Sequence, residues 1–492
     1  MVEPWITEEM ETLNLEDRRL DKRLAQVLSQ LSGRPTASIP AACGGYAEMA
    51  AAYRLFDNEK VQFDNILQPH KDATRRRLAQ HPVVILPQDT TEIELTRPQQ
   101  QVVGAGPLDD GPRRGVFLHL LHAFTPDGTP LGTVHAAVWV RPDTPPPKKS
   151  QRGARRRNTP IEDKESYRWV EGFRQASAEA RGTPTSQFVT LTDSEGDMYE
   201  VLAEAKDRPT NLNWIVRACR DRAVIGPEVQ KVASPGRGLT AAGVRRQFGK
   251  EPVRFTQTIH VRGRRSKVAC EDRGRRQPRR SRTAQVEVRS TRVTLRPPWR
   301  VDRRLPEVTV NVVWVREVAP PADEVPVEWM LLTSLPIDED DQIRQVIQYY
   351  GVRWMIEIAF RTLKSGCQVE HRRFEHVHRL LPSLAVYLIV TWRTLYICRL
   401  GRAFPQAHCE LLFEPAEWKA TYQVVRRQPP PITPPPLTDM VRMVGQLGGY
   451  VKRKRADEPG PQTIWLGLQR VHDIALCWQL FGPETRTESQ DV

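Results

Sequence analysis

The apolar positions of the first eighty residues recur every three to four positions, as in helices that bury one face. Across positions 14–31 the apolar residues form one stripe, made of Leu20, Leu24, Val27, Leu28 and Leu31. This spacing predicts an amphipathic helix, and a second helix is expected from Ala47 to Phe56. We therefore expect residues 1–78 to form a helical N-terminal domain.

From position 81 the pattern changes to short apolar runs, which predict strands. These runs are VVILPQD, GVFLHLLHAF, GTVHAAVWV, FVTLTDSEGD, NWIVRACR, VTVNVVWV and VEWMLLTS. Helical spacing returns at 341–364 and 381–400, and the proline-rich stretch 429–436 predicts a linker before a last helical segment. The order of elements indicates a mixed α/β protein, whose 492 residues allow roughly three domains.

Charge narrows the class of partner. The chain holds 73 Lys and Arg against 59 Asp and Glu, a net charge of +14, which favours a polyanion such as nucleic acid. A membrane partner is less favoured, because the apolar run Leu380–Trp392 is shorter than the roughly 18 residues of a spanning helix. The acidic opening residues do not resemble a secretion signal. Seven scattered cysteines without a CxxC pair argue against disulfide scaffolds and zinc fingers and favour the cytoplasm.

Most of the surplus charge lies in one stretch. Val261–Arg304 contains sixteen basic and four acidic residues. Within it, QVEVRSTRVTLR alternates apolar and polar residues, and we expect a strand whose charged face carries Arg289, Arg292 and Arg296. Such a ribbon suits a phosphate backbone, although a solvated surface hairpin has the same pattern. A second basic run at 148–157 is expected to be a loop.

Two acidic residues stand where apolar strands are expected to end. Asp89 closes VVILPQD, and Asp193 closes the apolar part of FVTLTDSEGD, with Asp197 four residues later. Taken singly, such an acid is more often a turn or helix cap than a catalytic group.

A third acid lies on the helix expected at 341–364. At 100° per residue its polar residues share an arc of roughly 100°; they are Tyr350, Arg353, Trp354, Glu357, Arg361 and Lys364. The apolar residues fill the opposite side. A solvated face with pairs four residues apart would contribute only a few tenths of a kcal/mol per pair, and it would leave the exposed Tyr350 and Trp354 unexplained.

Asp89, Asp193 and Glu357 together could hold two divalent cations, Mg²⁺ or Mn²⁺, which suit carboxylate oxygens. Two such ions activate a water or a 3′-hydroxyl and stabilise the leaving oxygen of a phosphodiester. Cations on the same helix could hold flanking phosphates, and a tryptophan could stack on an unpaired base.

At these residues the chain resembles the insertion-sequence-four family of bacterial DDE transposases, most closely its transposon-five branch. Tyr350, Arg353, Glu357 and Lys364 match the spacing of the family's Y-R-E-K signature. Asp89 in QDTT and Asp193 in TDSEGD are similar to its first two catalytic acids. Further islands that resemble the family are AAYRLFDN, VWVRPD, DKESYRW and VEWMLLTSLP. The block DSEGD departs from the branch, which has an arginine in its second place, so we expect one phosphate contact of the family to be missing here.

The resemblance implies an α/β, RNase H-like catalytic core over 79–404, with a β-rich basic insertion at about 206–342. It implies transposon-end binding by residues 1–78 and dimerisation by a helical region at 405–492. Base-stacking roles would fall to Trp329 and Trp354, and a place near the active site to Arg217. The activity implied is cut-and-paste transposition by a homodimer on DNA ends, through nicking, hairpin formation and strand transfer, in the bacterial nucleoid.

Two other functions remain open on the sequence. A DNA-binding protein without catalysis would bind ends and never cut them. An RNase H-like nuclease would cleave but would not join ends to a target. The intact set of three acids argues against the first, and only a strand-transfer product separates the second.

Overall fold

The computed structural model describes residues 3–109, 111–144, 150, 158–225, 232–234, 237–240, 243–245, 251–261, 263, 280–300, 302–322, 324–452 and 458–483. The basic stretches 264–279 and 151–157 lie outside these residues, so the loops expected there are not part of the description. The chain forms two compact units. Unit 1 joins Met1–Pro145 with Trp354–Val492, and unit 2 is Pro146–Arg353.

Unit 1 begins with helices. They are α1 (Pro4–Glu9), α2 (Arg18–Gly33), α3 (Ile39–Cys43), α4 (Tyr46–Phe56) and α5 (Phe63–Leu78). Helix α2 begins four residues later than the apolar stripe predicts, because the Asp17 carboxylate caps it and accepts from the Arg19 amide at 2.9 Å. The residues that we expected on its apolar face are buried from Leu24 onward.

An antiparallel sheet follows these helices in unit 1. Its strands are β1 (Val83–Glu94), β2 (Gly106–Pro107), β3 (Arg114–Phe124) and β4 (Pro130–Trp139). β3 pairs with β1, β4 and β2. The register sets Asp89 opposite Leu120.

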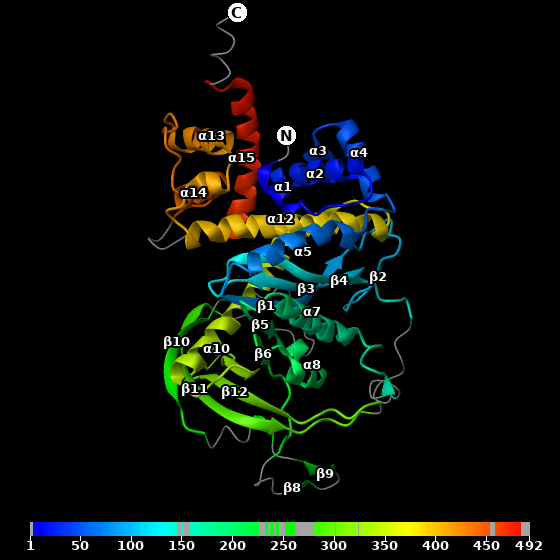
Figure 1. The fold of residues 1–492 in the computed structure, drawn as a ribbon, viewed down its shortest axis with the longest axis vertical. Helices are drawn as coiled ribbons and strands as arrows, with labels where there is room; N and C mark the ends of the chain where they lie inside the picture. The colour runs from blue at the N-terminus through cyan, green and yellow to red at the C-terminus, as the bar shows by residue number, and fades with distance from the viewer. Residues whose placement is uncertain are drawn as a thin grey trace, which may run out of the picture. The chain divides into compact units, whose positions relative to one another are not determined.

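Unit 1 is completed by the last third of the chain. Its elements are α11 (Trp354–Arg361), the π-helical turn η4 (Thr362–Gly366), η5 (Val369–His371), α12 (Val377–Ala403), η6 (Cys409–Leu411), α13 (Pro415–Arg426), α14 (Leu437–Leu447) and α15 (Pro461–Phe481). Within this unit one side of α12 faces β4 and α5. Its other side faces the N-terminal helices α2 and α4 and the C-terminal helices α14 and α15 (Figure 1).

Helix α12 is longer than its apolar run. Among the described residues it is the one helix long and apolar enough to cross a membrane, but 83% of its most apolar window is buried inside the protein. Its side chains form a common core with α2, α4, β1 and β3. The position of α12 in this core accounts for its apolar composition.

Unit 2 contains further strands and flanking helices. Its helical elements are η1 (Glu165–Tyr167), α7 (Arg168–Gly182), η2 (Ser194–Gly196), α8 (Tyr199–Glu204), η3 (Ala205–Asp207) and α10 (Asp340–Val352). Its strands are β5 (Gln187–Thr192), β6 (Leu212–Arg217), β7 (Val224–Ile225), β8 (Val232–Ser234), β9 (Arg237–Thr240), β10 (Phe255–Val261), β11 (Arg282–Leu295), β12 (Val308–Glu317) and β13 (Glu328–Thr333).

The order of these strands within unit 2 is β10-β11-β12-β13-β6-β5, with β7 on β11 and β8-β9 as a separate hairpin. β5 and β6 are parallel, and α7 packs on both. The strand that precedes Asp193 therefore belongs to the same compact unit as the basic strand β11.

Candidate active site

Asp89 is half-buried on β1 of unit 1. Its Oδ1 accepts a hydrogen bond from the Thr90 amide at 2.7 Å. The expectation that the strand ends at Asp89 is wrong, since β1 continues to Glu94 and pairs with β3 along this whole length. A position inside a paired strand fixes the backbone of Asp89 more firmly than a loop would.

Glu357 belongs to the same unit as Asp89. It is half-buried in the first turn of α11, and α11 packs on β1. The opposite side of α11 buries Met355, Ile356 and Ala359. The apolar face thus fixes the helix on the strand that carries Asp89, while Trp354 stays 40% exposed.

Lys364 lies in the π-helical turn η4 that follows α11. Its Nζ is 3.2 Å from Glu370 Oε1, and the same oxygen accepts from the Glu94 amide at 3.0 Å. The lysine is therefore tied through Glu370 to the end of β1.

Unit 2 brings together residues that lie far apart in the sequence. Asp193 directly follows β5, as predicted, and its carboxylate caps η2 by accepting from the Glu195 amide at 2.8 Å. Burial raises the pKa of the Tyr350 hydroxyl, the charges of Arg353 and Arg217 oppose this, and the Asp193 carboxylate raises it further.

Trp329 completes this group in unit 2. Its ring meets the edge of the Tyr350 ring, with centroids 5.9 Å apart. Arg217 donates to the Glu328 carbonyl at 3.4 Å, beside Trp329 on β13. Arg217, Trp329 and Tyr350 thus lie together in unit 2, and the charges of Asp193 and Arg353 act on the Tyr350 hydroxyl.

The continuous helix that we expected through the Y-R-E-K residues is wrong. α10 ends at Val352, Arg353 donates its amide to the Tyr350 carbonyl at 3.1 Å in a tighter turn, and α11 begins at Trp354. Tyr350 is buried and not exposed, at 6% of its surface, and Arg353 is buried as well. The helical wheel fails for Tyr350 because side chains outside this helix, among them Trp329 of β13, pack on it.

Asp197, the last acid of DSEGD, has a structural role. It is buried and accepts from the amides of Cys219 at 2.9 Å and Arg220 at 3.1 Å. It also forms an ion pair with Arg222. These bonds fix the segment that leaves β6 just after Arg217. The sequence shows two aspartates in DSEGD, Asp193 and Asp197. Their spacing alone does not indicate which of the two has this structural role.

The basic strand β11 does not have the single charged face that we expected. Arg289 and Arg292 are three positions apart and therefore lie on opposite faces. Arg289 donates to the Glu251 carbonyl at 2.6 Å and lies 3.4 Å from Glu287. Arg292, which is more exposed, donates to Asn311 at 2.9 Å. Arg296 shares the face of Arg292 and is exposed.

The donor set fits a hard divalent cation. Asp89, Asp193 and Glu357 offer carboxylate oxygens, the ligands that Mg²⁺ and Mn²⁺ prefer. Asp89 and Glu357 belong to unit 1 and Asp193 belongs to unit 2. Within the described part of the chain, no three Asp, Glu, His or Cys side chains form a ready metal cluster.

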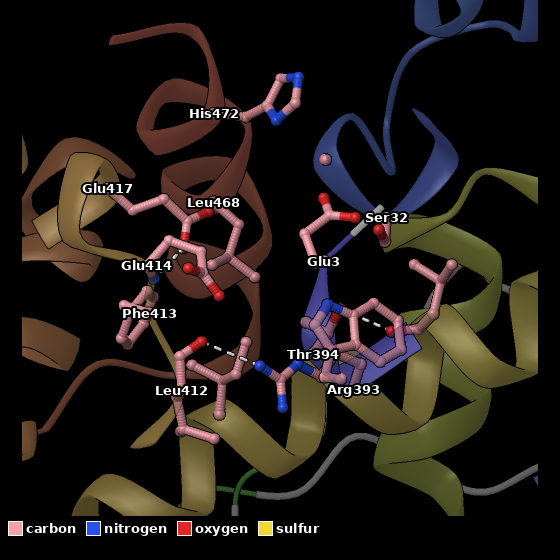
Figure 2. Close-up of a pocket in the computed structure, with 14 residues that line it drawn as sticks. Glu3, Ser32, Arg393, Thr394, Leu412, Phe413, Glu414, Glu417, Leu468 and His472 are labelled. Carbon is pink, nitrogen blue, oxygen red and sulfur yellow. Dashed lines mark hydrogen bonds between the residues drawn. The ribbon is translucent and has the colours of Figure 1, made fainter. Parts of the chain in front are cut away.

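A cavity in unit 1 lies away from these acids, between α1, α12, α13 and α15 (Figure 2). It has a volume of about 60 Å³. Arg393 in its wall donates to the Leu412 carbonyl at 2.9 Å and stacks 4.9 Å from the Trp5 ring centre. Glu3, Glu417 and His472 also line it.

Known families match three parts of the chain. The Transposase DNA-binding family matches residues 2–61, the Transposase DDE domain matches 206–386 and the Transposase Tn5 dimerisation domain matches 389–477. Glu357 lies inside the second match, whereas Asp89 and Asp193 precede it.

A solved structure, the cryo-EM structure of a piggyBac transposase synaptic complex with hairpin DNA, covers 97% of this chain and 78% of that chain. The two share 10% sequence identity with a TM-score of 0.35, a likeness too low to support an inference.

Proposed function

Because the chain belongs to the Tn5-type family of DDE transposases, we propose that Asp89, Asp193 and Glu357 form the active site with which it cuts DNA at the ends of its own element. Membership confirms the α/β RNase H-like fold class and a metal-dependent nuclease and strand transferase. It also supports the predicted partners in outline, namely DNA and a second copy of the chain.

The observation that carries the proposed site is the group around Tyr350. Tyr350 and Arg353 are two residues of the Y-R-E-K set, and in unit 2 the charges of Asp193 and Arg353 both act on the Tyr350 hydroxyl. A third, Glu357, lies on the helix that packs on the strand of Asp89 in unit 1. Each of the three acids thus has a described neighbour from the same proposed site.

Two Mg²⁺ or Mn²⁺ ions, when bound, would supply an activated water or 3′-hydroxyl and would stabilise the leaving oxygen. Asp89, Asp193 and Glu357 would hold them through carboxylate oxygens. Arg217, Arg353 and Lys364 would orient phosphates on either side of the scissile bond.

We infer the course of the reaction from the family. A water attacks the phosphodiester at the transposon end and frees a 3′-hydroxyl. That hydroxyl attacks the opposite strand, which forms a hairpin and releases the flanking DNA. A second water opens the hairpin, and the 3′-hydroxyl then attacks target DNA. The half-buried Trp329 and the exposed Trp354 would receive the bases that leave the stack.

DNA binding and pairing are assigned to the outer parts of the chain. Residues 1–78 would bind the transposon end, residues 79–404 would form the catalytic domain with an insertion at about 206–342, and residues 405–492 would pair two subunits. α15 presents apolar side chains to solvent that suit this pairing, among them Leu476, Leu480 and Phe481. The enzyme would act on the bacterial nucleoid.

The test is a cleavage assay with Mg²⁺ on a labelled duplex that carries the terminal repeat, resolved on a denaturing gel. We expect a nick followed by a hairpin-length product, and no product from Asp89→Asn, Asp193→Asn or Glu357→Gln although these variants still bind the end. Full activity in any of the three would remove that residue from the site. Binding without cutting by the wild type would favour the non-catalytic DNA-binding protein, and cutting without strand transfer would favour the nuclease.

A further inference from the structure

His119 of β3 bonds to both residues that flank Asp89. The imidazole is fully buried. Its Nε2 lies 3.1 Å from Gln88 Oε1, and its Nδ1 lies 2.8 Å from Thr90 Oγ1. Side chains alternate along a strand, so Gln88 and Thr90 share one face of β1 and Asp89 projects from the other. His119 therefore holds the strand from the face behind Asp89.

The hydrogen-bond partners Gln88 and Thr90 indicate which ring nitrogen of His119 carries the hydrogen. The amide oxygen of Gln88 can only accept, so Nε2 carries the hydrogen and donates it. Nδ1 is then the acceptor, and the Thr90 hydroxyl donates to it. Both nitrogens of His119 are satisfied, which offsets the cost of burying a polar ring in an apolar strand.

Thr90 connects this ring to the carboxylate. Its hydroxyl donates to His119, and its backbone amide donates to Asp89 Oδ1 at 2.7 Å. Since both donors belong to one residue, the hydrogen bond to His119 restrains the orientation of the amide that holds the carboxylate.

We propose that His119 is a positioning residue, which acts through Thr90 to hold the Asp89 carboxylate in the orientation that binds a divalent cation. This inference rests on the proposed role of Asp89 as a metal ligand. Bulk alone does not explain the residue, because an apolar side chain at this position would lack the hydrogen bonds that His119 makes to Gln88 and Thr90.

Two substitutions separate the two hydrogen bonds. His119→Asn places an amide oxygen near the position of Nδ1 and can keep the bond to Thr90. His119→Gln reaches the position of Nε2, keeps the bond to Gln88 and loses the bond to Thr90. His122 is a matched control, because it is buried on the same strand but bonds to Thr133 of β4 at 3.1 Å.

The readout is Mn²⁺ affinity of the full-length protein without DNA, measured by electron paramagnetic resonance, together with the melting temperature. Loss of a group that orients a metal ligand lowers affinity by about 10- to 100-fold. We expect a loss of about tenfold for His119→Gln, near wild-type affinity for His119→Asn, and unchanged affinity for His122→Asn although its melting temperature falls.

Wild-type Mn²⁺ affinity in His119→Gln, with only a lower melting temperature, would overturn the proposal and leave His119 as a packing residue. If His119→Gln does not fold, Thr90→Val removes the same bond and is expected to lower the affinity to the same extent. Asp89→Asn distinguishes the proposed role of Asp89 as a metal ligand from the proposed positioning role of His119. If it binds Mn²⁺ as the wild type does, the assignment of Asp89 fails. If it loses binding while Thr90→Val does not, only the positioning role fails.

Discussion

Single residues in unit 2 determine how the proposed site is built. The Tyr350 side chain is buried, and the charges of Arg217, Arg353 and Asp193 act on its hydroxyl. Asp197 fixes the segment beyond Arg217. Removal of one of these polar groups should therefore act on catalysis through the position of its neighbours.

Tyr350→Phe removes a buried hydroxyl on which the charges of Arg217 and Arg353 act. If this hydroxyl positions its charged neighbours, its loss is expected to cost about 1.4 kcal/mol of transition-state stabilisation, so nicking should slow by roughly tenfold. Single-turnover nicking of a labelled end measures this. Tyr349→Phe is the control, because Tyr349 lies on the same helix and its hydroxyl accepts from Gln345 at 2.9 Å. Equal losses in both variants would contradict the prediction.

Trp329→Ala should impair hairpin formation more than the first nick, because base stacking is needed only when a base leaves the helix. The ratio of hairpin to nicked product on the same gel measures this, and Trp329→Phe should restore part of it. The ring also packs on Tyr350. An equal loss at both steps would therefore indicate a packing role alone.

At the scale of elements, the sequence predicted the existence and type of most helices and strands. The exact ends of these elements and the burial of their polar side chains were harder to predict, because contacts between elements determine them. The pairing of β1 with β3 extends the strand past Asp89. The turn at Arg353 interrupts a helix whose apolar spacing looks continuous. Nothing in the local pattern indicates that Tyr350 is buried, since the groups that surround it come from β5, β6 and β13.

Because the arginines of β11 lie on two different faces, we expect them to affect the salt dependence of DNA binding differently. Arg292→Gln with Arg296→Gln should lower the salt dependence of end binding, by a slope of up to about 0.9 for each phosphate that these side chains neutralise. Arg289→Gln should leave the slope unchanged, because Arg289 lies on the other face and bonds to Glu251 and Glu287. Binding constants over a range of salt measure both. An equal effect of Arg289→Gln would show that DNA reaches the other face.

A buried ionic group connects α1 to the sheet in unit 1. Glu9 contacts His70 and forms an ion pair with Arg77 at 2.8 Å. Arg77 lies 4.1 Å from the Trp392 ring centre, and His70 Nε2 accepts from the Thr133 amide at 3.0 Å. Burial alone would raise the pKa of Glu9, but the charges and hydrogen bonds of His70 and Arg77 outweigh it and lower the pKa to about 2.

Glu9→Gln should lower the free energy of unfolding by about 3 kcal/mol, because it leaves Arg77 without its buried partner. A depressed pKa gives stability that is present above pH 4.5 and lost as the pH falls toward 2. The variant should lack that part of the acid dependence. Thermal unfolding between pH 2 and 6 measures both effects. Glu8→Gln is the control, because Glu8 is the exposed neighbour of Glu9. Equal acid dependence in Glu9→Gln and the wild type would contradict the assignment.

At the scale of the whole molecule, residues from both ends of the chain line one cavity of unit 1 (Figure 2). Burial raises the pKa of Glu417 to about 7, although a backbone hydrogen bond and the charge of Arg393 act against it. A raised pKa gives stability that is complete below pH 4.5 and is lost as the pH rises to about 7.

Glu417→Gln should therefore remove a decline in stability between pH 4.5 and 7, worth roughly 3–4 kcal/mol at about 1.4 kcal/mol per pKa unit. Thermal unfolding across this range measures it. Glu414→Gln, three residues earlier and exposed, removes only the weakest of the effects on the Glu417 pKa and should leave most of the decline in place. A decline that persists in Glu417→Gln would assign it to another group.

The composition of unit 1 from Met1–Pro145 and Trp354–Val492 has a consequence for how the protein is made. A growing chain on the ribosome carries Asp89 and Asp193 well before Glu357 has been synthesised. Domains generally fold as units during synthesis, and this unit lacks its central helix α12 until most of the chain has emerged. A nascent or prematurely terminated polypeptide is therefore expected to lack both the core and the third acid, and only completed translation yields an enzyme able to cut DNA.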